Sequence, residues 1–363
     1  MKRLKVGILG QGRSGRAIHA DSLSRMPELF EIAAVADPLP DRCESARRAF
    51  GCDAYPSLEG LLGRGDLDLI VNATPSHLHV PLTAQILDAG FNVLCEKPLA
   101  RRAAEVDRLI ARARRRGRRL AVFQQSRFAP YFRQVREVVD SGVLGRIVLV
   151  KIRFNGFGRR WDWQTLRRMN GGSLLNTGPH PLDQALHFVG RDAMPTVACV
   201  MDRVNSFGDA EDHVKLILTR PGRPMVDLEI SSCSAYSPYT YVVCGSRGSL
   251  AGTMTHIEWK YFREEEAPPQ RLLETPLPNL AYCGEALPWH EEKWDVPPES
   301  KDLFGTMARL FYTNLHAHLA ADAPLEVPLE QVRQQIAVIE EAHRQNRSYP
   351  RAPRRPVRRA TGN

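Results

Sequence analysis

Three glycines directly follow the first apolar run of the chain. Residues 4–9 read LKVGIL, and a G-x-G-x-x-G pattern comes next, before a helix-like stretch over 13–25. Glycines at this spacing permit a tight turn and a close approach of the backbone to a pyrophosphate, and the helix N-terminus supplies amide donors. The pattern in this setting predicts a dinucleotide site at Gly10, Gly12, Arg13, Ser14 and Gly15.

An acidic residue ends the next apolar run. Asp37 closes the run 31–37 and stands 22 residues after Gly15. This position suits a carboxylate that accepts from both ribose hydroxyls of NAD and repels the 2′-phosphate of NADP. Arg42 follows closely in the sequence and leaves NADP open as a second cofactor. The alternative is that the glycines form an ordinary turn and that Asp37 is a simple strand-end acid.

Short apolar runs alternate with helix-like stretches through the first third of the chain. The runs are 4–9, 31–37, 67–74, 92–96 and 120–124, and the helix-like stretches are 13–25, 41–50, 78–89 and 101–116. Buried strands that alternate with helices indicate a parallel sheet with crossover connections. We therefore expect an α/β protein that begins with a doubly wound NAD(P)-binding Rossmann domain over residues 1–125.

The pattern changes near residue 126. Helices are expected at 130–141, 181–189, 300–320 and 328–345, and strands at 146–155, 195–204, 213–220, 225–233, 239–244 and 249–263. This order predicts a substrate and oligomerisation domain of the α+β type over 126–349, with a large, mainly antiparallel open sheet and helices on one side. Residues 265–298 hold seven prolines and are expected to form a long surface excursion.

The positive charge of the chain is concentrated in two segments. The net charge is +9, of which residues 101–119 contribute +7 (nine Arg against two acids) and the last twenty residues another +7, so the remainder carries −5. No aromatic residue interleaves with the first segment to stack on bases. We interpret the two segments as a solvated helix face and a mobile basic tail at 350–363, and expect no nucleic-acid partner.

Cysteine usage and hydropathy indicate the cellular compartment that suits the chain. The seven cysteines are scattered without a C-x-x-C pair, which favours reduced thiols and no metal site. No apolar run reaches the roughly 18 residues of a membrane span, and the first residues lack the features of a secretory signal. We expect a cytoplasmic protein with a small-molecule substrate and no membrane partner.

Four motifs together resemble the Gfo/Idh/MocA oxidoreductases. They are VGILGQGRSG at 6–15, ATPSHLH at 73–79, VLCEKP at 93–98 and GGSLLNTGPHPLD at 171–183, and they occur in the order found in that family. The family is named for glucose–fructose oxidoreductase, inositol dehydrogenase and a rhizopine-catabolism protein. The resemblance implies an N-terminal nucleotide-binding domain, a C-terminal domain with a large open sheet, and NAD- or NADP-dependent chemistry on sugars, cyclitols or related polyols.

The resemblance also assigns roles to residues. It implies that Lys97 bonds the reacting hydroxyl and that His180 is the general base. It places Glu96 and Pro98 on the cofactor side, and the loop beside the nicotinamide ribose at Thr74, Pro75 and His79. From the residues alone, a surface lysine in a salt bridge is the favoured interpretation of Lys97, and His180 is equally a capping or core histidine.

Two positions depart from the family pattern. Asn176 stands where its dehydrogenases usually carry Asp, and Ser76 stands where Asn is common. A neutral amide can orient the His180 ring, but it cannot stabilise an imidazolium as a carboxylate would. We therefore group Asn176 with Lys97 and His180 as the candidate catalytic residues.

Candidate substrate residues come from the second half of the chain. Trp161 and Trp163 flank Asp162, and flat aromatic faces beside an acid suit a sugar ring and its vicinal hydroxyls. Asn155 shares a strand face with Arg153 by its period of two. Arg127 opens the second domain and is also assigned to the substrate. The alternatives are a core tryptophan, a loop acid and a solvated strand face.

Three functions fit these residues. The first is an oxidoreductase that moves hydride between a sugar, cyclitol or polyol hydroxyl and NAD or NADP. The second is an enzyme of the glycosidase or lyase type that keeps its NAD and oxidises a sugar transiently. The third is a non-catalytic sensor that binds NAD without turnover. In each case helices on one side of the second sheet favour a homodimer or homotetramer.

Overall fold

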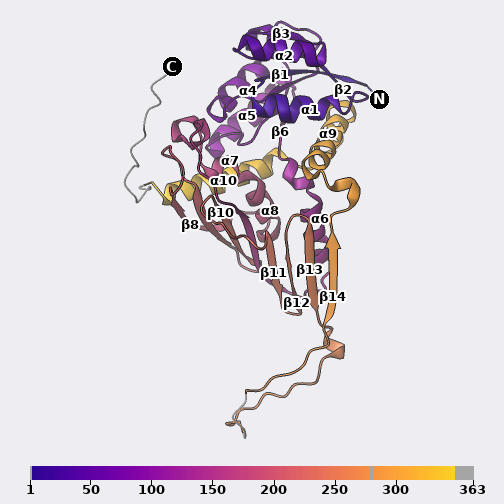
Figure 1. Ribbon diagram of the computed structural model, residues 1–363, viewed down its shortest axis with the longest axis vertical. Helices are drawn as coiled ribbons and strands as arrows, with labels where there is room; N and C mark the ends of the chain where they lie inside the picture. The colour runs from indigo at the N-terminus through magenta and orange to yellow at the C-terminus, as the bar shows by residue number, and fades with distance from the viewer. Residues whose placement is uncertain (1, 278–281, 348–363) are drawn as a thin grey trace.

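The chain forms two sheets, one from each half of the sequence. The computed structural model describes residues 2–277 and 282–347 (Figure 1). The expected tail at 350–363 lies outside the described residues. Within the described ranges, no helix combines the length and the apolar character needed to cross a membrane.

The first sheet has six parallel strands in the order β3-β2-β1-β4-β5-β6. The strand order reverses at β1, and ligands bind at such a switch point in doubly wound folds. This arrangement confirms the predicted fold class for the first half. The short strand β3 was not expected, because three residues are too few to show an apolar pattern. The strands are β1 (Leu4–Leu9), β2 (Phe30–Ala36), β3 (Asp53–Tyr55), β4 (Leu69–Asn72), β5 (Asn92–Cys95) and β6 (Leu120–Val122).

Helices cover the first sheet. The helix after the glycine loop begins as a π-helix, η1 (Arg13–Ala20), and continues as α1 (Asp21–Ser24). In α5 (Ala103–Arg116) the residues Val106, Leu109 and Ala113 are buried, while Arg108 and Arg114 to Arg116 are exposed. That face is the solvated basic surface expected from the charge pattern. The other elements are α2 (Pro40–Phe50), α3 (Leu58–Leu62), η2 (Ser76–Leu78), α4 (His79–Asp88) and α5 (Ala103–Arg116).

The second sheet has eight strands in the order β14-β13-β12-β11-β7-β10-β9-β8. Only the central pair β7 and β10 is parallel among the described strand pairs, which confirms a large and mainly antiparallel sheet. The strands are β7 (Ile147–Asn155), β8 (Thr196–Asp202), β9 (His213–Thr219), β10 (Met225–Ser231), β11 (Tyr241–Gly245), β12 (Gly248–Gly252), β13 (His256–Tyr261) and β14 (His290–Asp295).

Two expectations for this sheet were wrong in detail. The run expected as one strand at 249–263 is the hairpin β12–β13, whose turn is held by Thr253 Oγ1 accepting from the main-chain N–H of His256 at 3.1 Å. The expected excursion contains the edge strand β14, which reads HEEKWD. An edge strand can carry charges on both faces, so β14 shows no apolar alternation.

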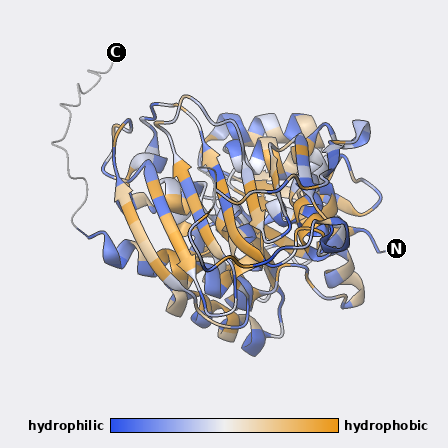
Figure 2. Ribbon diagram, turned by 90° about the horizontal axis from the view of Figure 1, so that it is seen from below, coloured by the Kyte–Doolittle hydropathy of each residue, from blue (hydrophilic) through white to orange (hydrophobic). Residues whose placement is uncertain are grey.

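Helices pack on one face of the second sheet. Helix α8 packs on β7 and β10, α10 packs on β8, and α6 packs on β13. In β10 the residues Val226, Leu228 and Ile230 are buried beneath these helices, whereas Asp227 and Glu229 keep partial exposure on the other face. Figure 2 shows hydrophobic and hydrophilic residues alternating along these strands. The helices are α6 (Pro130–Asp140), α7 (Ser173–Asn176), α8 (Pro179–Val189) and α10 (Leu329–Gln345).

One late helix returns to the first sheet. Although α9 (Leu303–Ala321) follows all strands of the second sheet, it packs beside α1 (Figure 1). Tyr312 lies 2.6 Å from His19 Nδ1, and His316 Nε2 lies 2.8 Å from the main-chain oxygen of Lys2. Residues from the two ends of the chain therefore share one core.

Candidate active site

The three motif glycines meet different constraints. Gly10 has φ +91°, and a Cβ at Gly15 would lie 1.7 Å from the main-chain oxygen of Gly10. Both glycines are therefore required by the turn itself. A Cβ at Gly12 would meet only Arg42 Nη1, at 3.7 Å. Gly12 thus faces open space at the start of η1, which is the cradle that a pyrophosphate would fill beside Arg13 and Ser14.

Asp37 is fixed beside the glycine loop. The side chain is only 3% exposed. Its Oδ2 accepts from the N–H of Gln11 at 2.7 Å and its Oδ1 from the N–H of Leu39 at 3.0 Å. Arg42 Nη1 also lies 3.2 Å from Oδ2. A carboxylate offers about four acceptor positions, so the expected bond to both ribose hydroxyls requires Arg42 to move away.

We expect Asp37→Ala to weaken NAD binding by about tenfold or more and to relax discrimination against NADP. The variant removes the ribose acceptor and the charge that repels a 2′-phosphate. Titration with each cofactor, followed by tryptophan fluorescence, measures the two dissociation constants. Arg42→Ala is the matched control, because it empties the same corner and leaves the carboxylate, so it should keep the preference for NAD. An unchanged NAD-to-NADP ratio in Asp37→Ala would contradict the assignment.

The loop after β4 is tied to the loop after β5. Thr74 Oγ1 donates to Asn72 Oδ1 at 2.7 Å. His79 is buried, and its Nδ1 and Nε2 lie 2.7 Å from Pro98 O and 2.9 Å from Thr74 O. Burial lowers the pKa of His79. His79 was expected to contact the cofactor, but both of its ring nitrogens face main-chain oxygens, so it braces the loop that carries Thr74 and Pro75.

Glu96 and Lys97 follow directly after β5. Glu96 Oε2 accepts from the N–H of Lys97 at 3.0 Å, and Oε1 lies 3.2 Å from His19 Nε2. Burial disfavours the charged form of Glu96, but the bond with His19 and the charge of Lys97 outweigh it and hold its pKa at about 2. Burial lowers the pKa of Lys97, and the charges of Arg13 and Arg160 act in the same direction.

Lys97 reaches across to the second half of the chain. Its Nζ donates to the main-chain oxygen of Asn176 at 3.1 Å. A break between α7 and α8 makes this oxygen available: Thr177 and Gly178 are helical, but the N–H of His180 bonds to Thr177 O at 3.1 Å instead of to Asn176 O. Pro179 has no N–H to continue the helical ladder. The contact with Lys97 thus uses the backbone at position 176.

His180 lies in the first turn of α8. Its Nδ1 is 3.1 Å from Ser126 Oγ in the segment η3 (Gln125–Phe128). Burial and, to a smaller extent, the charge of Lys97 lower the pKa of His180 to about 3. The ring is therefore neutral near pH 7 and able to accept a proton. The contact with Ser126 was not foreseen, because Ser126 carries no motif and lies 54 residues away in sequence.

Arg127 was wrongly expected to bind substrate. The guanidinium is buried and bonds both carboxylate oxygens of Asp183, at 2.7 Å from Nε and 2.5 Å from Nη2. Nη1 donates to Glu326 O at 2.8 Å and to Gln331 at 2.7 Å. A bidentate pair with no exposed donor joins η3 to α8 and to the start of α10, so Arg127 holds the fold together.

Asn155 belongs to a polar cluster on the face of the second sheet away from the helices. Its Nδ2 donates to Glu229 Oε1 at 2.5 Å. Lys215 Nζ lies 3.2 Å from Glu229 Oε2 and 2.5 Å from Asp227 Oδ1. The sequence alternative of a solvated strand face describes Asn155 better than the expected substrate contact.

The tryptophan segment forms a loop between the two halves. Trp161 is 78% exposed, and Asp162 accepts from the N–H of Gln164 at 2.8 Å and pairs with Arg160 at 2.7 Å. Trp163 is partly buried in the short helix η4 (Trp163–Thr165). Further along the loop, Asn170 Nδ2 reaches Ser76 O at 3.4 Å. The loop therefore spans from the second sheet to the loop after β4. The Trp161 ring makes an edge contact with Phe207, with the ring centres 6.5 Å apart.

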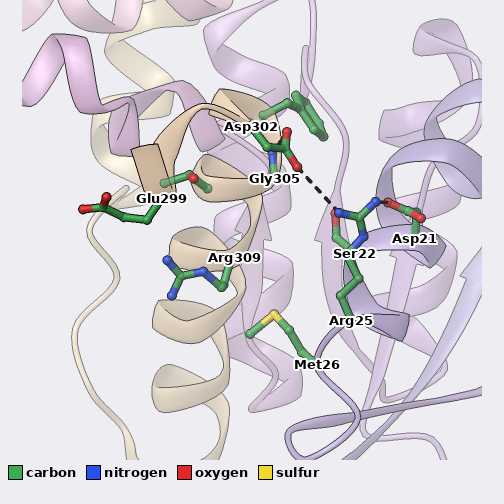
Figure 3. Close-up of a pocket in the computed structure, with 10 residues that line it drawn as sticks. Asp21, Ser22, Arg25, Met26, Glu299, Asp302, Gly305 and Arg309 are labelled. Carbon is green, nitrogen blue, oxygen red and sulfur yellow. Dashed lines mark hydrogen bonds and ion pairs between the residues drawn. The ribbon is translucent and has the colours of Figure 1, made fainter. Parts of the chain in front are cut away.

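A cavity of about 330 Å³ lies elsewhere, between α1 and the start of α9 (Figure 3). Arg25 pairs with Asp21 at 2.9 Å and lies 3.6 Å from Asp302 at its wall. None of the expected site residues lines this cavity. Within the described ranges, no group of three or more His, Cys, Asp or Glu side chains could hold a metal ion.

Two family models match the chain. Residues 4–124 match the model described as "Oxidoreductase family, NAD-binding Rossmann fold", and residues 132–251 match the GFO/IDH/MocA C-terminal domain. An uncharacterized oxidoreductase of Schizosaccharomyces pombe is 26% identical over 97% of this chain and 99% of its own. Inositol 2-dehydrogenase of Rhizobium meliloti is 29% identical over 68% of this chain and 75% of its own.

A solved structure shares the whole architecture. The WlbA dehydrogenase of Bordetella pertussis, determined in complex with NADH and UDP-GlcNAcA, superimposes with a TM-score of 0.76. It is 22% identical, and the match covers 95% of this chain and 96% of that one. At this identity the likeness establishes the fold, and the two family models establish the kinship. The chain is thus a NAD-binding oxidoreductase of the Gfo/Idh/MocA family.

Proposed function

We propose that the protein is a dehydrogenase that transfers hydride between a hydroxyl-bearing carbon of a sugar, cyclitol or related polyol and the nicotinamide of NAD. The observation that carries this proposal is the bond from Lys97 to the backbone of Asn176, four residues before His180. It joins Lys97, at the end of the parallel strand β5, to the backbone one turn before His180 in the other half of the chain. The kinship with an inositol 2-dehydrogenase supports a polyol as the substrate.

The residues around the glycine loop fit NAD. Gly12 leaves room for the pyrophosphate at the N-terminus of η1, and Asp37 stands at the end of β2 for the ribose. NADP is the less favoured cofactor because Asp37 is charged and buried. When bound, NAD supplies the hydride acceptor. Thr74 and Pro75 lie on the braced loop at the nicotinamide side.

His180 and Lys97 divide the proton chemistry. Ser126 engages Nδ1 of His180, so Nε2 is the nitrogen left to accept the proton of the reacting hydroxyl. The ammonium of Lys97 donates to the hydroxyl oxygen and stabilises the negative charge that develops on it. As the C–H hydride leaves, the C–O bond becomes a carbonyl and the proton stays on His180. The main-chain oxygen of Asn176 accepts a hydrogen bond from Lys97 and so orients the ammonium group.

The loop of Trp161, Asp162 and Trp163 is the proposed contact for the substrate ring. Trp161 offers an exposed aromatic face, and the same loop touches the first half of the chain through Ser76. Asp162 caps η4 and pairs with Arg160. It would therefore contact a substrate hydroxyl in addition to these structural bonds.

A screen of polyols tests the proposal. Purified protein is incubated with NAD and single cyclitols, aldoses and sugar acids, and NADH is followed by its absorbance. Release of NADH with at least one substrate supports a dehydrogenase. Protein that purifies with tightly held cofactor, releases no NADH and cleaves a glycoside supports transient oxidation instead, which the weakly basic His180 favours. Binding of NAD with neither activity would contradict both enzymes and leave a sensor.

We also propose a homodimer or homotetramer that uses the face of the second sheet away from its helices. Val200 and Met225 are 52% and 41% exposed on that face, among the ion pairs of Lys215. A second copy would cover these apolar side chains. Light scattering at micromolar concentration is expected to give two or four times the chain mass, and Val200→Lys is expected to lower that mass. A monomer at every concentration would refute this.

A further inference from the structure

Three buried polar side chains, those of His19, Glu96 and Tyr312, form a line next to Lys97. They come from η1, from the end of β5 and from α9, which are distant in sequence. The Tyr312 hydroxyl lies 2.6 Å from His19 Nδ1, and His19 Nε2 lies 3.2 Å from Glu96 Oε1. The other oxygen of Glu96 accepts from the N–H of Lys97. His19 and Tyr312 are fully buried.

The charges in this line fix where its protons are. Glu96 is ionised, because its pKa is about 2, so both of its oxygens are acceptors. His19 Nε2 lies 3.2 Å from Glu96 Oε1, so the ring presents this nitrogen to the carboxylate. When Nε2 alone carries the ring proton, Nδ1 is an acceptor and the Tyr312 hydroxyl donates to it. Burial raises the pKa of Tyr312 well above its usual value, so the hydroxyl keeps its proton.

Packing alone does not explain the hydroxyl of Tyr312. The ring lies among aromatic neighbours, with its centre 5.5 Å from Phe30 and 5.8 Å from each of Phe123 and Phe311. A phenylalanine would fill this space equally well and would bury no polar atom. A buried hydroxyl costs free energy unless it is bonded, and the bond it makes here is the one to His19. The hydroxyl therefore fixes the orientation of the His19 ring.

We propose that Tyr312 and His19 are positioning residues for Lys97, which hold the Glu96 carboxylate ionised and fixed so that its charge keeps Lys97 in the ammonium form. This inference rests on the proposed function, in which the ammonium bonds the reacting hydroxyl. Glu96 is the neighbour that raises the pKa of Lys97, against burial and the cations around it. The charged and titratable groups that act on this pair are Arg13, His19, His79, Arg160, His180 and Tyr312.

Removing the Tyr312 hydroxyl should disturb Glu96 at a distance. In Tyr312→Phe the His19 ring loses the partner that holds its Nδ1, so the ring is free to rotate and to take Nε2 away from the carboxylate. Glu96 must then turn away or take up a proton. Either change weakens the negative charge beside Lys97, so the pKa of Lys97 falls, and the ammonium is lost at a lower pH. The backbone of Lys97 also loses its fixed partner.

The pH dependence of kcat tests this. The rate is expected to fall at high pH as Lys97 loses its proton. Tyr312→Phe should lower kcat by about tenfold, because the contact of His19 with the charged Glu96 is weakened with it. It should also move the high-pH limb down by about one pH unit and leave the dissociation constant for NAD nearly unchanged. A merely structural role would lower the rate at every pH without moving the limb.

Two further variants make the test specific. Glu96→Gln should move the same limb downward by at least as much, and adding Tyr312→Phe to it should produce no further movement, because both act through one charge. Arg309→Ala changes an exposed residue on the same helix, one turn from Tyr312, and should leave rate and limb unchanged. Melting temperatures check that each variant is folded.

The possible outcomes distinguish a failure of the positioning role from a failure of the proposed function. A limb that stays in place in Tyr312→Phe, or movements that add in the double variant, would overturn the positioning role. If turnover survives in Lys97→Met, the proposed function itself fails, whatever Tyr312 does. If Lys97→Met is inactive and the limb of Tyr312→Phe is unmoved, only the positioning role is lost.

Discussion

Lys97→Met is expected to lower kcat by about a thousandfold or more while leaving the affinity for NAD within about twofold. Methionine keeps the length of the side chain but removes the ammonium group that donates to the reacting hydroxyl. Removing one donor from a developing oxyanion costs about a hundredfold to a thousandfold in other enzymes, and loss of proton transfer adds to this. The residues proposed for the pyrophosphate and the ribose, Gly12 and Asp37, follow other strands of the sheet, β1 and β2.

Single-turnover kinetics and fluorescence titration of NAD measure the two quantities separately. Lys215→Met serves as the matched control, because this lysine pairs with Asp227 and Glu229 on the second sheet and should keep full activity. The result that would count against the assignment is weakened NAD binding in Lys97→Met. Lys97 would then act mainly as the tether from β5 to Asn176.

The fold was predictable where burial on both faces leaves an unbroken apolar run. β1, β2, β4 and β5 are such runs, and the glycine pattern marks the turn after β1. β3 and β14 escaped prediction because they are edge strands, with three residues in one and four charged residues in the other. Pairing with a neighbour, which the sequence does not display, determines such strands.

The site was predictable only in its motif residues. Lys97 and His180 are read from local patterns, but their partners are contributed by distant segments that carry no pattern. Ser126 is 54 residues from His180, and Tyr312 is 293 residues from His19. The role expected for Arg127 was wrong because the sequence alone does not distinguish an arginine that faces a ligand from one that pairs with a buried acid. Burial decides between the two, and burial is a property of the fold.

The second large effect is expected from Asn176→Asp, which restores the acid that the family usually carries at this position. Lys97 bonds the main-chain oxygen of Asn176, so Asn176→Asp should leave this contact in place. Thr177 and Gly178 are helical, which puts residue 176 one turn before His180. A carboxylate there would lie close to both Lys97 and His180. An opposite charge within about 4–6 Å raises the pKa of a histidine by about 1–3 units when solvent is largely excluded.

The sign of the change in activity follows from the proton chemistry. In the proposed mechanism His180 accepts the proton in its neutral form, so the rate is lost as pH falls through its pKa, which burial and the charge of Lys97 hold at about 3. Asn176→Asp raises that pKa and should move the low-pH limb of kcat/KM upward by about 1–3 pH units. His180→Ala should remove the limb, and Asn176→Ser, which has no charge, should leave it in place. A limb that stays unmoved in Asn176→Asp would mean that the two side chains do not interact, and His180 would then work with Lys97 alone.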